Sequence, residues 1–281
     1  MLERDEYIEQ AYLFRSLLER MEDNSSVQDL LLSIREELLA TTNLPKAVEF
    51  LTAELKLTGG LSEGMRRLSH YFTPFQAFVV SESERDGGKF DFRTALDVLR
   101  REAAFRGEGC SPQASFIYQF ECLARNRLGY DRGLEAISRD PIYTPEWSEW
   151  ILNVRRQIGI VDFADLVYAR SEHYLKARRA QGLDLDGPER PILFGEKEGR
   201  IAVAHRRKEP LLLFAALQRH LNYPTVPRLQ RADEQKHVLP LLVRRMERLE
   251  GRLKLVEEEQ RGGIDLSRFM GPSNETLPSD E

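Results

Sequence analysis

Carboxylates and a histidine of the kind that bind metals gather in one stretch that is expected to be helical. Asp165 and Glu172 are seven residues apart and share a helical face, with Asp162 and His173 beside them. A carboxylate-bridged two-metal bundle requires a Glu-x-x-His motif on each of two helices, and only Glu234–His237 has that spacing. We therefore interpret Asp162 as a helix N-cap and the other side chains as a solvated face, and we predict neither a metal nor a cofactor.

The two cysteines are the candidate nucleophiles. Cys110 directly precedes Ser111–Pro112, and a position near a helix N-terminus can lower a thiol pKa, but no local histidine or resolving cysteine supports it. Cys122 lies in an apolar helix, which indicates a buried, unreactive thiol. No nucleophile elbow, phosphate loop or dinucleotide motif is present. The sequence therefore predicts no catalytic residue, and an enzyme whose site is assembled from distant residues remains an alternative.

Basic residues form the one candidate nucleic-acid contact. They lie on a short element and its exit, at Lys197, Arg200, Arg206, Arg207 and Lys208. The helix expected next, Pro210–Leu221, would complete a helix-turn-helix with a basic edge. That helix is mostly apolar, whereas a recognition helix needs polar side chains that reach base edges. The net charge of −5 gives no general attraction to nucleic acid, so this binding role is the weaker hypothesis.

A coiled-coil seam near the end of the chain carries the leading hypothesis. Apolar residues alternate at spacings of three and four, at Leu239, Leu242, Met246, Leu249, Leu253 and Val256. With Met246 at position a, Arg245 would face Glu250 of a second parallel copy, and Arg252 would face Glu257. Both charge pairs are attractive, so the pattern predicts a homodimer through this helix.

The same helix has a second interpretation. The seam covers roughly two and a half heptads, whereas about three to four make a coiled coil clear. Gly251 inside it weakens the helix by about 1 kcal/mol relative to alanine. Such a helix can instead lay its apolar stripe on the protein's own body. Both interpretations stay open, and no residue of a partner protein is identified.

The rest of the chain is expected to be all-α and soluble. Hydrophobic residues make up 41% and charged residues 31%, no apolar run approaches the ~20 residues of a membrane span, and the acidic N-terminus lacks a secretory signal. Together with the two cysteines, this predicts a cytoplasmic location. Helix starts follow from capping residues, with a hydroxyl before proline at Thr73–Pro74, Ser111–Pro112 and Thr144–Pro145.

The predicted architecture is an irregular multi-helix bundle or helical array followed by a short coiled-coil helix. We divide it into a helical body at 1–180, a small subdomain with Gly/Pro-rich linkers at 181–230, the coiled-coil helix at 231–263 and a flexible tail at 264–281. Within it we expect a helix from Ser25 to about Ala40, a short helix over Glu63–Tyr71 and a long helix over Phe163–Ala180. Near Glu196–Arg206 we expect either a helix or a β-hairpin, and over Asn222–Leu229 we expect an extended strap. Trp147 and Trp150 belong either to the core or to a partner-binding hot spot. The function predicted is a non-enzymatic interaction or scaffold protein.

Overall fold

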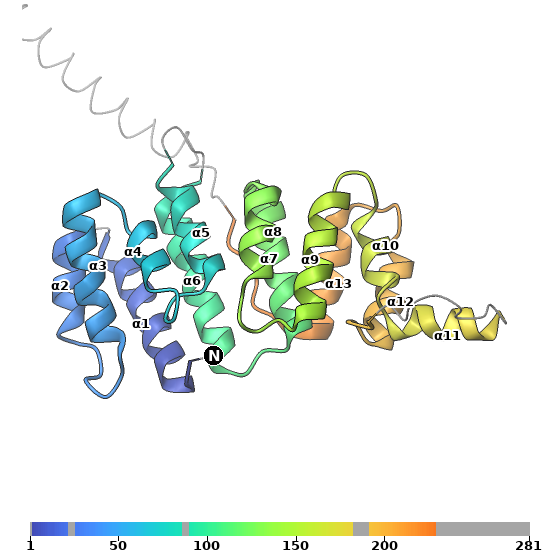
Figure 1. Ribbon diagram of the computed structural model, residues 1–281, viewed down its shortest axis with the longest axis horizontal. Helices are drawn as coiled ribbons and strands as arrows, with labels where there is room; N and C mark the ends of the chain where they lie inside the picture. Colours follow the sequence, from blue (N-terminus) through green and yellow to red (C-terminus); the bar gives the residue numbers. More distant parts are fainter. Residues whose placement is uncertain (1, 22–25, 86–89, 182–190, 229–281) are drawn as a thin grey trace, which may run out of the picture. The chain divides into compact units, whose positions relative to one another are not determined.

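The computed structural model describes residues 2–21, 26–85, 90–181 and 191–228. The chain divides into two compact units, 1–229 and 230–281, and the described residues all belong to the first. Across those ranges they form thirteen α-helices and two isolated β-bridges, with no β-strand, which confirms the all-α prediction (Figure 1). No helix in these ranges combines the length and the apolar character that crossing a bilayer requires.

Most of the helices follow one another with short connections, and the longest connection lies between α11 and α12. Their bounds are α1 Arg4–Arg20, α2 Val27–Arg35, α3 Leu44–Thr58, α4 Ser62–Arg67, α5 Pro74–Ser83, α6 Phe92–Gly107, α7 Pro112–Asn126, α8 Tyr130–Ser138, α9 Pro145–Gln157, α10 Phe163–Tyr168, α11 Glu172–Ala180, α12 Glu196–Ala204 and α13 Pro210–Leu221.

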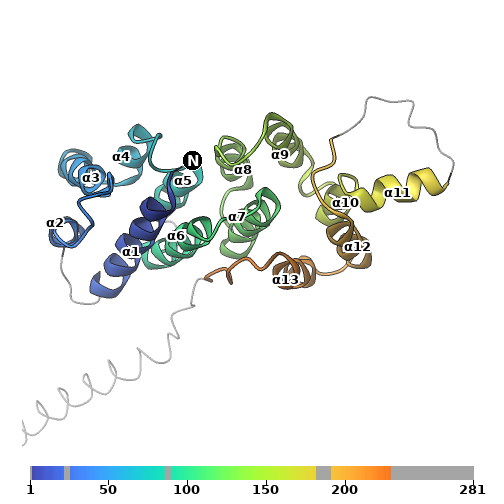
Figure 2. The ribbon, with the colours of Figure 1, turned by 90° about the horizontal axis from the view of Figure 1, so that it is seen from below.

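The middle of this unit consists of two rows of helices. In one row α1 lies along α6, and α7 packs against α13; in the other α4, α5, α8 and α9 contact one another in order (Figure 2). Contacts of α5 with α6 and of α7 with α8 join the rows. Many contacts connect helices that are neighbours in the chain, but the most extensive one joins α1 to α6.

Capping residues place most helix starts where the sequence predicts them. Thr73 and Ser111 accept hydrogen bonds from the backbone N–H groups of Gln76 and Ala114, at 3.2 Å each. The third expected hydroxyl cap is wrong: α9 begins at Pro145, but the Thr144 side chain makes no capping bond. The cap of α2 is Ser26 rather than Ser25, and that helix ends at Arg35 rather than near Ala40. Likewise α4 ends at Arg67, before the predicted Tyr71.

The long helix predicted over Phe163–Ala180 is wrong, because the chain breaks between α10 and α11. Ser171 caps α11 by accepting from the Tyr174 N–H at 3.3 Å, and its hydroxyl donates to the Tyr168 carbonyl at 2.7 Å. The backbone N–H of Glu172 then donates to the Phe194 carbonyl at 3.0 Å. A contact with a distant segment therefore replaces the helical hydrogen bonds. No residue of α11 is buried, so Tyr174 lies outside the core.

The element near Glu196–Arg206 is a helix, α12, and not a hairpin. It packs very closely on its neighbours at Gly199. A Cβ atom on Gly199 would lie 2.7 Å from the Cβ atoms of Ser171 and His173. Only glycine lets α12 lie directly on the break between α10 and α11.

Aromatic side chains fill the core between the two rows. Phe120 and Phe163 stack with ring centroids 4.1 Å apart, and Phe116 meets Trp150 edge to face at 4.9 Å. Trp147 and Trp150 are 5% and 3% exposed, so the hot-spot interpretation is wrong and the core interpretation is confirmed.

Candidate functional site

The predicted basic cluster lies on α12 and on the turn that joins it to α13. Arg200 pairs with Glu196, which also binds Lys176 of α11. In the turn, the backbone N–H of Arg207 donates to the Asp162 carboxylate at 2.6 Å. The side chains of Lys197, Arg207 and Lys208 are exposed. Part of the cluster therefore ties helices together, and part of it faces solvent.

Arg206 is the member of the cluster with the clearest structural role. Its Nε atom lies 2.5 Å from the Asp165 carboxylate, and its guanidinium lies 4.2 Å from the centre of the Tyr168 ring. Both partners belong to α10, so this cation fastens the end of α12 to α10 by an ion pair and a cation–π contact. Helix α13 buries Leu213, Phe214 and Leu217, as its apolar sequence indicates.

The carboxylates considered for metal binding are separated by the break after α10. Asp162 and Asp165 belong to the start of α10, and Glu172 and His173 to α11. Asp162 accepts from the Ala164 N–H at 3.0 Å, which confirms it as an N-cap. Within the described ranges, no group of three or more His, Cys, Asp or Glu side chains is placed to hold a metal ion.

The thiols are both free, and neither is activated. Burial raises the pKa of the half-buried Cys110, and the nearby Arg106 only partly opposes this. The pKa of Cys110 is therefore raised, and not lowered as considered for a position near a helix N-terminus, because desolvation has the largest effect on it. Cys122 is fully buried, and burial raises its pKa well above the ordinary value, as expected of an unreactive core thiol.

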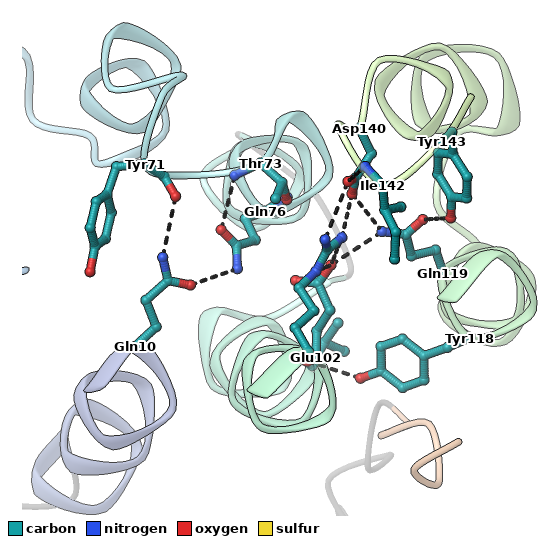
Figure 3. Close-up of polar contacts among 12 residues, drawn as sticks. Gln10, Tyr71, Thr73, Gln76, Glu102, Tyr118, Gln119, Asp140, Ile142 and Tyr143 are labelled. Atoms are coloured by element: carbon teal, nitrogen blue, oxygen red, sulfur yellow. Dashed lines mark hydrogen bonds and ion pairs between the residues drawn. The ribbon is translucent and has the colours of Figure 1, made fainter. Parts of the chain in front are cut away.

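A buried polar network connects the two rows of helices (Figure 3). The Arg106 guanidinium donates to Glu102 at 2.9 and 3.0 Å and to Asp140 at 3.2 Å, with a second, shorter contact to Asp140. Gln119 donates to both carboxylates at 3.1 Å and accepts from the Tyr143 hydroxyl at 2.7 Å. The side chains of Arg106 and Asp140 are fully buried. The network thus joins α6, α7 and the turn after α8.

Glu102 carries the uncompensated charge of this network. Its Oε2 atom has no hydrogen-bond partner among the described residues, and two carboxylates share one guanidinium. Burial raises the pKa of Glu102, and the Arg106 charge opposes that effect without cancelling it. The nearby buried Asp140 carboxylate also raises the pKa of Glu102, because two adjacent buried negative charges repel each other.

A second buried network joins α1 to the start of α5 (Figure 3). Gln10 donates to the Tyr71 carbonyl at 3.3 Å and accepts from Gln76 at 3.1 Å. The Gln76 side chain in turn accepts from the Thr73 N–H at 3.0 Å. Neither network is visible in the sequence, because buried polar residues look like surface residues along a helix. The Thr73–Gln76 capping box was the one local signal.

The strap predicted over Asn222–Leu229 corresponds to a segment without regular secondary structure at Tyr223–Arg228; Asn222 is the left-handed C-cap of α13, and Leu229 lies outside the described residues. The Tyr223 hydroxyl donates to Glu121 at 2.6 Å, and Tyr223 and Val226 are each 3% exposed. Arg101 donates to the Thr225 carbonyl at 3.0 Å, and Asn126 donates to the Pro227 carbonyl at 3.1 Å. Side chains of α6 and α7 therefore hold the strap up to the last described residues.

The predicted self-association residues lie outside the described residues. They are Leu239, Leu242, Arg245, Met246, Leu249, Glu250, Arg252, Leu253, Val256 and Glu257. In comparisons with known proteins, no protein family, curated protein or solved structure matches the chain.

Proposed function

We propose that this chain is a non-enzymatic cytoplasmic interaction or scaffold protein that forms a parallel homodimer through Leu239–Val256. The observation that carries the proposal is the anchored strap. Because Tyr223 and Val226 are buried against the body, the last described residues have a fixed place in it, and the predicted seam begins shortly after them in the sequence. An anchored segment shortly before the seam supports a role for that seam in joining two copies.

The apolar seam supports pairing between copies on energetic grounds. Burying one leucine, isoleucine or valine side chain contributes about 1.5–3 kcal/mol, so six seam residues favour a partner strongly. The paired charges at Arg245–Glu250 and Arg252–Glu257 add about 0.2–1 kcal/mol each and select the parallel orientation. The polar groups considered for catalysis, such as Asp162 and Asp165, already serve as caps and ion-pair partners in the body.

Charge exchange between two variants tests the proposal. Arg245→Glu with Arg252→Glu places like charges across the parallel dimer, and so does Glu250→Arg with Glu257→Arg. We expect each variant alone to dimerise more weakly, and an equal mixture to form a heterodimer that restores pairing. Pairing that is unchanged in both variants, or a mixture that stays unpaired, would contradict parallel association.

A second candidate function is nucleic-acid binding by the exposed part of the basic cluster. It is favoured by Lys197, Arg207 and Lys208, whose side chains are exposed and have no carboxylate partner among the described residues. Binding to a generic duplex should weaken steeply with added salt, and Arg207→Glu with Lys208→Glu should abolish it. Absence of binding at low salt would remove this candidate.

A further inference from the structure

A groove with an apolar floor and an arginine rim lies between α4, α5 and α8. It has a volume of about 520 Å³. Its floor includes Phe72, Ala77, Phe78 and Ala136, and its rim carries Arg66, Arg132 and Arg139 with Glu135 as the lining carboxylate. Packing of α5 on α8 brings these side chains together from segments that are distant in sequence.

Two of the three rim arginines are held by exposed ion pairs. Arg66 pairs with Glu63 at 2.7 Å, and Arg139 pairs with Glu135 at 2.6 Å. Side-chain exposures of 48% and 69% make each pair worth at most about 1 kcal/mol. A carboxylate brought by a ligand can therefore take the place of either partner at little energetic cost.

Arg132 is the least engaged of the three cations. It is 56% exposed and contacts Glu82 at 3.3 Å, and its other contact is the Ser81 hydroxyl at 3.5 Å. Glu82 is shared with Arg85, which lies 3.4 Å away. One carboxylate thus serves two guanidinium groups, and Arg132 retains N–H donors that can bind a second carboxylate in the forked geometry that arginine favours.

We propose that this groove docks a short acidic segment of a partner protein, with an apolar side chain on the floor and flanking carboxylates on Arg132 and Arg139. The lining carries three cations against one carboxylate, which is complementary to such a segment. A nucleic acid fits less well, because the floor is apolar and suits an apolar side chain of a peptide rather than a phosphate backbone. The inference rests on the proposed interaction role and names its partner chemistry, but it does not depend on dimerisation.

Selection from a random library of linear peptides, with the full chain immobilised, tests the docking site. We expect the selected peptides to combine Asp or Glu with a large apolar residue. For a labelled selected peptide, Arg132→Glu with Arg139→Glu should weaken binding by roughly tenfold or more, equivalent to about 1.4 kcal/mol. Ala136→Trp should fill the groove and remove binding.

Arg156→Glu on α9 is the matched control, since it reverses an exposed arginine outside the groove and should leave binding unchanged. Circular dichroism of each variant checks the fold, and the double arginine variant alone decides the matter if Ala136→Trp does not fold. No enriched peptides, or peptides that bind the double variant as well as the parent, would overturn the proposal. So would a single-stranded oligonucleotide that binds with the same dependence on Arg132 and Arg139. Light scattering on the same samples reports dimerisation separately.

Discussion

Arg106 and Asp140 form an ion pair that is fully buried, although 34 positions separate them in the chain. The pair connects α6 to the turn after α8, and Glu102 and Gln119 complete its hydrogen bonds. A charge cluster of this kind fixes the relative placement of the two rows of helices, because neither carboxylate has solvent as an alternative partner.

Removal of the central cation should be strongly destabilising. Arg106→Met leaves two buried carboxylates without their common donor, and we expect the free energy of unfolding to fall by about 3–5 kcal/mol. Urea unfolding followed by circular dichroism measures the change. Arg156→Met removes an exposed arginine and should change stability by no more than about 0.5 kcal/mol. Equal, small effects in both variants would show that the buried cluster does not hold the helices together.

Glu102 should make stability depend on pH in a defined direction. Its pKa is raised in the folded protein, so the folded state holds a proton that the unfolded state releases as pH rises. The contribution is therefore fully present below the ordinary glutamate pKa of about 4.3 and is lost as pH rises through the higher folded value. Glu102→Gln keeps an oxygen acceptor for Arg106 and should remove this decline. Unfolding midpoints across pH for both proteins test it, and parallel profiles would contradict it.

Gly199 should tolerate no side chain. In Gly199→Ala the added Cβ lies 2.7 Å from the Cβ atoms of Ser171 and His173, so α12 must move away from the break between α10 and α11. We expect a loss of about 1–3 kcal/mol, despite the better helix propensity of alanine. Gly129→Ala is the control, because nothing lies within 4 Å of its added Cβ. Thermal unfolding of the two variants should separate them clearly, and equal midpoints would refute the close approach.

The strap should detach when its buried hydroxyl is removed. Tyr223→Phe removes the hydroxyl that donates to the Glu121 carboxylate at 2.6 Å and lies 3.0 Å from the Phe214 carbonyl, its alternative acceptor. Leaving a buried acceptor unpaired costs about 1–3 kcal/mol. We expect faster limited proteolysis within Tyr223–Arg228, detected by mass spectrometry. An unchanged cleavage rate would mean that Val226 and the hydrogen bonds from Arg101 and Asn126 hold the strap without this hydroxyl.

Local sequence signals predicted where helices begin more accurately than they predicted the tertiary contacts between helices. Thr73, Ser111 and Asp162 are caps because a side-chain oxygen before a helix meets N–H groups a few residues away, and that relationship is visible in sequence. The break at Ser171 was not predictable in this way, since its partner Phe194 is brought close only by the tertiary fold.

The buried polar groups show the same limit. Glu102 and Arg106 are four residues apart, a spacing typical of an exposed helical ion pair. Nothing near them in sequence indicates Asp140 or Gln119, whose approach buries the pair. The groove rimmed by Arg132 and Arg139 was missed for a related reason, because α5 and α8 meet only in the folded array.

Solution mass by multi-angle light scattering, for the full chain and for a truncation ending at Arg228, tests the central claim most directly. The truncation keeps all thirteen described helices and the strap, and it removes the predicted seam. We predict a dimer for the full chain and a monomer for the truncation. A monomeric full chain would contradict self-association through Leu239–Val256, and so would a truncation that remains a dimer.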